Sequence, residues 1–94
     1  MNKSIMQTEK VCFITGTTRN LDLHHCIHGS NRKKADKHGL TVYLNHDVHM
    51  RLHAHQKPFE GLDAKLKKVA QEAYMKHYGA TVEDFIREYG RNYL

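Results

Sequence analysis

The alternation of apolar and polar residues predicts short strands in the first half of the chain. Residues 21–25 alternate with a period of two, which suits a half-buried strand. Residues 40–44, LTVYL, are dense in β-branched and aromatic side chains and predict a second strand. Residues 11–15 form a β-prone run ended by Gly16, which predicts a strand and a turn. Residues 1–10 are polar and are expected to form an N-terminal arm.

A helix is expected directly after the second strand. Asn45 or Asp47 can cap its first turn, because short polar side chains accept hydrogen bonds from free backbone N–H groups. The helix should end before Pro58, since the residue ahead of a proline is pushed out of helical geometry. Its apolar and imidazole side chains are Val48, His49, Leu52 and His53.

Two further helices are predicted in the last third of the chain. Residues 62–78 carry apolar side chains at helical spacing, and Gly79 suits a left-handed C-cap. A last helix is expected to begin after Thr81 as N-cap and to end at Gly90. Its buried side should consist of Phe85, Ile86 and Tyr89. Strands followed by helices within 94 residues predict one small α+β domain, residues 1–94.

Charge and composition narrow the class of partner. Fifteen Lys and Arg against ten Asp and Glu give a net charge of +5, which favours a polyanion such as nucleic acid. A positive excess of this size is also explained if it only keeps the protein soluble. Two cysteines are too few for a disulfide scaffold, and no run approaches the roughly 20 apolar residues of a membrane span. We therefore expect a soluble protein of a reducing compartment, without a membrane partner.

Most of the nine histidines fall within residues 23–55. His49 and His53 are four residues apart on the expected helix, so they share a face and can ligate one ion. Such pairs are also common on surfaces. The doublet His24-His25 ends the first strand, where adjacent side chains point to opposite sides, so that one can ligate and its neighbour can face a substrate. Paired strands followed by the helix would gather His24, His49 and His53 into a metal site.

This order of strand, histidine doublet, loop, strand and HxxxH helix resembles the HNH endonucleases. That resemblance implies a ββα-metal hairpin-plus-helix core, here with two additional C-terminal helices. The segments LHHCIHGSNRKKADKHGLTVYL and DFIREYGRNYL look like small phage and prophage HNH-like proteins. Those proteins are similar to phage recombination-enhancing nucleases that work with the bacterial strand-exchange recombinase. The resemblance therefore implies action on single- or double-stranded DNA in the bacterial cytoplasm, with a recombinase filament as partner.

The resemblance also implies a role for four histidines. His24 matches the first metal ligand, His25 the general base that deprotonates water, and His49 and His53 the two helix ligands. The ion would be Mg²⁺, Mn²⁺, Ni²⁺ or Zn²⁺, and cleavage would leave 5′-phosphate and 3′-hydroxyl ends. These roles are chemically consistent, because imidazole titrates near neutral pH and a cation stabilises charge developing on phosphate oxygens.

Two positions depart from the family pattern. The middle residue, often Asn, steadies the loop of the base, but Leu40 occupies that place here, with His38 as a substitute after a small shift in register. Many HNH proteins also bind a structural zinc through two cysteine pairs. Only one of the four matching positions is a thiol, so we expect no cysteine-bound zinc. Those positions hold Cys12, Thr15, Asn45 and Val48.

The loop after the doublet holds further candidates. His28 could be an alternate ligand, a phosphate contact or a solvated loop residue. The basic stretch 29–39 is expected to be a loop with room for one helical turn at 32–37. Such charge runs are usually solvated, but this one lies beside the expected site, which favours phosphate contacts with weak sequence preference and strong salt dependence. The candidate nucleic-acid-binding residues are Arg32, Lys33, Lys34 and, on the metal helix, Arg51.

Two other classes of function stay open at this point. The chain could be a DNA- or protein-binding accessory factor whose HNH fold cleaves weakly or not at all, and Leu40 is the observation that supports this alternative. A histidine-rich metal-binding module would explain the histidines but leaves the basic stretch unexplained.

Overall fold

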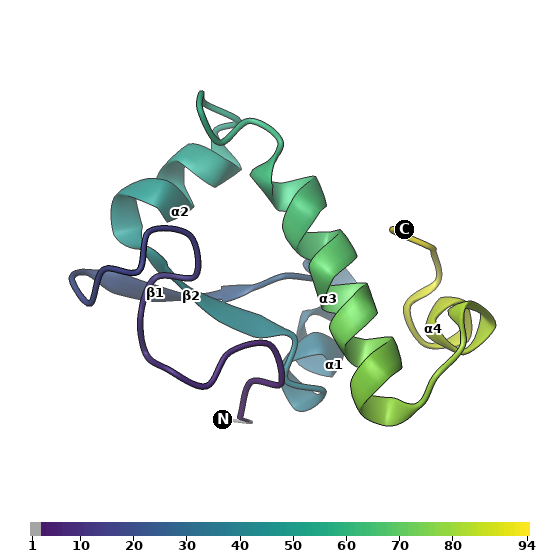
Figure 1. Ribbon diagram of the computed structural model, residues 1–94. Helices are drawn as coiled ribbons and strands as arrows, with labels where there is room; N and C mark the ends of the chain where they lie inside the picture. The colour runs from purple at the N-terminus through teal and green to yellow at the C-terminus, as the bar shows by residue number, and fades with distance from the viewer. Residues whose placement is uncertain (1–2) are drawn as a thin grey trace.

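A two-stranded antiparallel hairpin lies at the centre of the molecule (Figure 1). In this computed structural model, which describes residues 3–94, β1 (Leu21–His25) pairs with β2 (Thr41–Asn45). The register sets His24 opposite Val42 and His25 opposite Thr41. The first predicted strand is confirmed, and the second begins and ends one residue later than expected.

Helices make up most of the remaining described chain. A short 3-10 turn, η1 (Gly29–Asn31), and α1 (Arg32–Lys37) connect the strands. The longest helix, α3 (Leu62–Tyr78), lies between the N-terminal segment and α4 (Val82–Tyr89) in Figure 1. Helix α2 (His46–His53) follows β2 directly. Two antiparallel strands and four α-helices within residues 3–94 confirm the α+β class.

The helix ends follow the capping chemistry of the sequence. The Asn45 side chain accepts a hydrogen bond from the Asp47 backbone N–H at 3.1 Å, so Asn45 caps α2. Thr81 and Asp84 form a reciprocal capping box at the start of α4. Gly79 and Gly90 adopt left-handed φ values of 62° and 85°, which end α3 and α4 where the sequence predicts.

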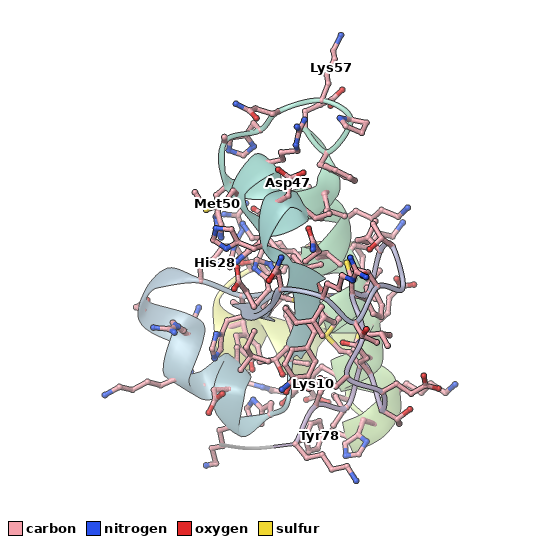
Figure 2. All side chains as sticks on the ribbon, turned by 90° about the vertical axis from the view of Figure 1, so that its left-hand side faces the viewer. Lys10, His28, Asp47, Met50, Lys57 and Tyr78 are labelled. Carbon is pink, nitrogen blue, oxygen red and sulfur yellow. The ribbon has the colours of Figure 1, made fainter. Side chains whose placement is uncertain are left out.

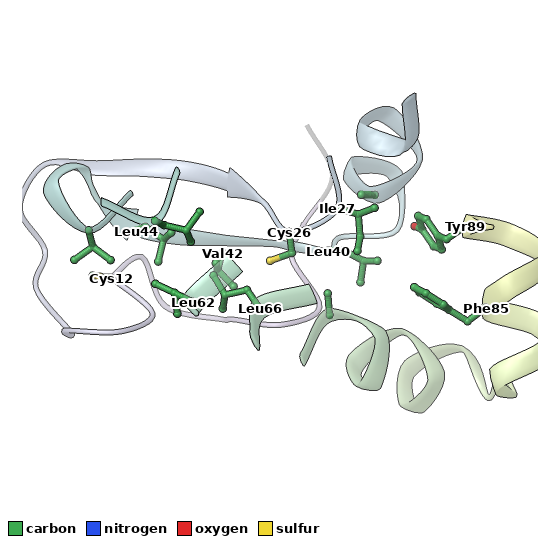
Figure 3. Packing of buried hydrophobic residues seen from close by; sticks show 14 residues of the cluster. Cys12, Cys26, Ile27, Leu40, Val42, Leu44, Leu62, Leu66, Phe85 and Tyr89 are labelled. Atoms are coloured by element: carbon green, nitrogen blue, oxygen red, sulfur yellow. The ribbon is translucent and has the colours of Figure 1, made fainter. Parts of the chain in front are cut away.

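A continuous apolar core joins the hairpin to the helices (Figure 3). It runs from Cys12 and Leu44 to Phe85 and Tyr89 at the far end. The expectation for Ile86 is wrong, because α4 turns Phe85 and Tyr89 inward and leaves Ile86 39% exposed at the edge of that face. The buried apolar residues are Cys12, Cys26, Ile27, Ala35, Leu40, Val42, Leu44, Val48, Leu52, Leu62, Leu66, Ala70, Phe85 and Tyr89.

The strand predicted at residues 11–15 is wrong. The segment folds back on itself, with Gly16 N–H donating to the Cys12 carbonyl and Cys12 N–H donating to the Thr17 carbonyl, both at 2.8 Å. Its link to the hairpin is a single backbone bond from Phe13 N–H to the Tyr43 carbonyl. Turn formation around a glycine in the left-handed region therefore prevails over the β propensity of the run.

The polar N-terminal segment packs against the hairpin. Residues 1–2 of the expected arm lie outside the described residues. The Ser4 hydroxyl donates to the Thr41 carbonyl at 2.6 Å, and Ile5 N–H donates to the Gly39 carbonyl at 2.9 Å. Gly39 has a φ of 74°, and a Cβ there would collide with the Lys3 carbonyl oxygen. The close approach of this segment therefore requires glycine at position 39.

Within residues 3–94, no helix has the length and apolar character needed to cross a membrane.

Leu40 is a core residue in this structure, fully buried just before β2. We expect Leu40→Asn to lower the free energy of unfolding by about 3 kcal/mol, because it removes apolar contacts and buries an amide. Urea denaturation followed by circular dichroism measures this change. Leu40→Met conserves volume and should cost less than about 1.5 kcal/mol. An Asn variant as stable as the native chain would show that the core tolerates an amide at position 40.

Candidate metal centre

His24 is the most deeply buried histidine of the proposed site. The alternation of β1 turns its ring inward, where it is 1% exposed. Burial, together with the neighbouring His49 and His28, lowers its pKa to about 3. Its Nε2 atom is the one buried side-chain nitrogen or oxygen without a hydrogen-bond partner among the described residues. His24 is therefore a neutral imidazole with an unsatisfied nitrogen.

Helix α2 brings two more imidazoles to His24. Because α2 begins immediately after β2, its residues 49 and 53 face the end of the hairpin one turn apart. The Nε2 atoms of His49 and His53 lie 3.1 Å apart. The ring centroids of His24 and His49 are 5.1 Å apart, and those of His24 and His53 are 5.6 Å apart. One ligand nitrogen from each ring lies within 4.8 Å of the other two.

This set of donors fits a divalent metal ion. Two nitrogens bound to a tetrahedral ion at about 2.05 Å are about 3.3 Å apart, close to the observed Nε2–Nε2 separation. The buried Nε2 of His24 would gain the partner that it lacks. Imidazoles suit Zn²⁺, Ni²⁺ and similar borderline ions. The predicted ligands His24, His49 and His53 are thus brought together by the fold.

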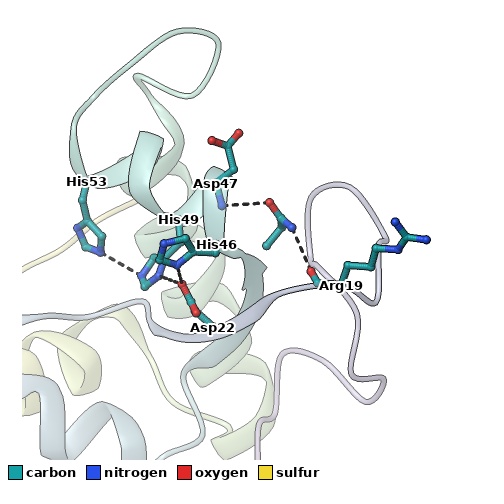
Figure 4. Close-up of polar contacts among 7 residues, drawn as sticks. Arg19, Asp22, His46, Asp47, His49 and His53 are labelled. Carbon is teal, nitrogen blue, oxygen red and sulfur yellow. Dashed lines mark hydrogen bonds and ion pairs between the residues drawn. The ribbon is translucent and has the colours of Figure 1, made fainter.

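Asp22 orients one of these ligands and was missed by the sequence analysis (Figure 4). Its Oδ2 accepts hydrogen bonds from His49 Nδ1 at 3.0 Å and from His46 Nδ1 at 2.7 Å. These bonds lower the pKa of the Asp22 carboxyl. Because the proton is held on His49 Nδ1, the lone pair of His49 Nε2 is available to ligate an ion. This Nε2 atom faces His53. The period of two in β1 could have identified Asp22, because residues two apart on a strand lie on the same face and Asp22 lies two residues before His24.

His28 also joins the centre, together with Asp63 from the first turn of α3. The His28 Nε2 atom donates to Asp63 Oδ1 at 2.7 Å. The His28 ring lies 5.3 Å from the His24 ring and 5.6 Å from the His53 ring, and its side chain lies just below α2 in Figure 2. Asp63 was missed because helical periodicity identifies the buried face of α3 but not what an acid in its first turn contacts.

His25 points away from the cluster, toward α1. Its Nε2 donates to Asp36 Oδ1 at 3.1 Å, and Arg32 Nε donates to its Nδ1 at 3.5 Å. The carboxylate fixes the proton on Nε2 and leaves Nδ1 with a lone pair. The side chain is 13% exposed. The adjacent residues of the doublet therefore face different elements, as the strand period requires.

His38 lies apart from the metal centre. Its Nδ1 is 2.7 Å from the Tyr89 hydroxyl, and its ring packs edge-on against Tyr74 and Tyr78. Burial lowers the pKa of His38. His38 therefore belongs to an aromatic cluster between α1, α3 and α4, and the structure places it against Tyr89 rather than against His25.

The basic residues distribute over two regions. Arg32 lies beside His25, and Lys33 is exposed on α1. Lys34 Nζ donates to the Glu88 carbonyl at 2.6 Å and lies over the Tyr89 ring, which ties α1 to α4. Arg51 pairs with Asp47 at 3.0 Å on α2. Arg32 thus contacts the proposed base, Lys33 lies on the surface of α1, and Lys34 and Arg51 make contacts within the fold.

The cysteines are buried in the core. Cys26 is fully buried, which raises the pKa of its thiol to about 12, and its Sγ lies 3.8 Å from Met6 Sδ. Cys12 is 1% exposed, and its Sγ accepts the Thr15 N–H at 3.4 Å. Val48, at another of the positions matched to a cysteine pair, is a buried apolar residue. The turn at Cys12 is therefore held by backbone bonds and apolar packing.

No protein-family model, curated protein or solved structure matches this chain. Function is therefore inferred from the geometry of the histidine cluster.

Ion binding to the three imidazoles should stabilise the fold. At a free concentration of Zn²⁺ or Ni²⁺ near 100 times Kd, we expect about 2.7 kcal/mol of stabilisation, which raises Tm by roughly 10 °C or more. Differential scanning fluorimetry with and without EDTA measures the shift. His53→Ala should abolish most of the shift, because it removes an exposed ligand without opening the core.

Asp22→Asn tests the orienting carboxylate. We expect it to weaken the affinity for the ion by about 10- to 100-fold, since the amide no longer fixes the proton on His49 Nδ1. Asp47→Asn is the matched control, because Asp47 lies on α2, the helix that carries His49, but pairs with Arg51. Equal affinities in the two variants would contradict the orienting role, and an undiminished Tm shift in His53→Ala would contradict the three-imidazole site.

Proposed function

We propose that this chain is a metal-dependent DNA endonuclease of the HNH type. Support comes from the juxtaposition of His24, His49 and His53 at the end of a hairpin followed by a helix, with His25 adjacent on the strand. This arrangement agrees with the ββα-metal order read from the sequence. The resemblance to phage and prophage proteins adds the proposal of a role in recombination, together with a bacterial strand-exchange recombinase.

In this proposal His25 acts as the general base. Asp36 holds the proton on Nε2, so the lone pair of Nδ1 is the basic atom. Nδ1 would take a proton from water as the water oxygen attacks phosphorus and the 3′ oxygen departs. The Arg32 hydrogen bond to Nδ1 is long, at 3.5 Å, and an arriving phosphate can compete for that guanidinium. The products would carry 5′-phosphate and 3′-hydroxyl ends.

The three imidazoles of His24, His49 and His53 would hold the divalent cation. The ion, when bound, supplies positive charge that stabilises the scissile phosphate and the departing oxygen. His24 contributes a nitrogen that burial keeps neutral, and Asp22 fixes the donor atom of His49. Three protein ligands leave coordination positions free for water and phosphate.

The different-class alternative is a DNA-binding accessory factor that cleaves weakly or not at all. Leu40 favours it, because a buried leucine cannot make the hydrogen bonds with which the family's middle residue steadies the base. The Asp36 carboxylate offers a compensating contact to His25 from α1. Nicking assays separate the two proposals.

Supercoiled plasmid is the substrate for the first assay. We expect nicking in Mg²⁺, Mn²⁺ or Ni²⁺ that EDTA abolishes and that His25→Ala lowers by about 10²- to 10⁴-fold, since the general base is lost. His77→Ala, an exposed histidine on α3, is the matched control. The assay is repeated with a recombinase filament assembled on the DNA, and activity only under that condition would support the recombination role.

Undiminished metal-dependent nicking by His25→Ala would exclude His25 as the base. Absence of nicking with every metal, with and without the filament, together with salt-sensitive DNA binding, would establish the accessory factor instead.

DNA binding should depend steeply on salt. Phosphate contacts release counterions, so the logarithm of the binding constant falls linearly with the logarithm of salt concentration. We expect Lys33→Ala to reduce that slope by about 1, measured by fluorescence anisotropy. Lys65→Ala, an exposed lysine on α3, should leave the slope unchanged. A slope reduced by Lys65→Ala and unchanged by Lys33→Ala would instead place the DNA-binding face on α3.

A further inference from the structure

The metal centre extends beyond the three imidazoles of the hairpin and α2. A second group of donor atoms, from His24, His28 and Asp63, also lies within 4.8 Å of one another. His28 comes from the loop after β1, and Asp63 comes from α3, outside the hairpin and α2. We propose that His24, His28 and Asp63 form a second position for the divalent cation, which a harder ion such as Mn²⁺ prefers.

The unsatisfied nitrogen of His24 connects the two positions. His24 is 1% exposed, and its Nε2 is buried without a partner. A neutral imidazole offers one lone pair for coordination, so this atom serves one ion at a time. The two groups of donors are therefore alternative positions of a single ion, next to one another and joined at His24.

The chemistry of the donors separates the two positions. His24, His49 and His53 supply nitrogen only, which suits Zn²⁺ and Ni²⁺. Asp63 adds a carboxylate oxygen, and two imidazoles with one carboxylate suit harder ions such as Mn²⁺ and Fe²⁺. The choice of ion thus decides which position is filled, and with it how far the ion lies from His49 and His53.

The surroundings of Asp63 keep its carboxylate charged. Burial raises the pKa of Asp63, but hydrogen bonds from His28 and Lys67 outweigh burial and lower it overall. Lys67 Nζ lies 3.0 Å from Oδ2, whereas Oδ1 faces His28 at 2.7 Å. The lysine therefore occupies Oδ2. An ion at this position would replace the hydrogen bond between His28 and Oδ1, with the His28 proton moved off the nitrogen that ligates.

This inference rests on the divalent ion of the proposed function and not on DNA cleavage. The test is Mn²⁺ binding alone, counted by the loss of the free-ion signal in electron paramagnetic resonance. The double variant His49→Ala/His53→Ala removes the all-nitrogen position. We expect it to bind one Mn²⁺ per chain, and the addition of Asp63→Asn to lower that affinity at least tenfold. Lys67→Met in the same background is the matched control, because it breaks the ion pair and removes no donor.

A measurement on otherwise native chains guards against misfolding of the double variant. Asp63→Asn alone should weaken Mn²⁺ binding more than Zn²⁺ binding, with far-UV circular dichroism unchanged. Native-like variants in which Asp63→Asn leaves Mn²⁺ affinity unaltered, or two ions bound per native chain, would overturn the inference. If the native chain binds Mn²⁺ as expected but does not nick DNA, the proposed nuclease function is contradicted and the second ion position is not.

Discussion

The buried, unpartnered Nε2 of His24 is the constraint around which the site is arranged. An unsatisfied buried polar atom costs about 1–3 kcal/mol, so the fold loses stability unless something binds this nitrogen. Its neighbours are imidazoles from α2 and from the loop after β1. A divalent cation would satisfy the nitrogen and hold these segments together. In a chain of 94 residues such metal–nitrogen bonds would add to the stability of the fold.

Carboxylates from three different elements surround the histidines. Asp22 of β1 contacts His49, Asp36 of α1 contacts His25, and Asp63 of α3 contacts His28. Each contact fixes which ring nitrogen carries the proton, and therefore which one is free to act. The tertiary fold thus orients the rings of His25, His28 and His49, with α1 and α3 supplying two of the three carboxylates.

The hairpin is held by packing at both ends. On one side the N-terminal segment bonds to β2 and to Gly39, two residues before it, and Cys12 closes a buried turn against the same strand pair. On the other side α1 is tied to α4 through Lys34, Tyr89 and His38. Leu40 lies in the core between these contacts. Leu40 thus serves packing, and the carboxylate that contacts His25 comes from Asp36 of α1.

Much of this fold could be predicted from the sequence, because it depends on interactions between residues that are close together in the chain. The period of two in residues 21–25, the Asn45 and Thr81 caps and the C-capping glycines act over a few residues, and their elements formed as predicted. The cluster of His24, His49 and His53 also followed, because strand and helix periods fix the direction of each side chain. The partners Asp36 and Asp63 lie 11 and 35 residues from their histidines. Only tertiary packing brings residues so far apart in the sequence into contact, and only tertiary packing decides the burial of His24.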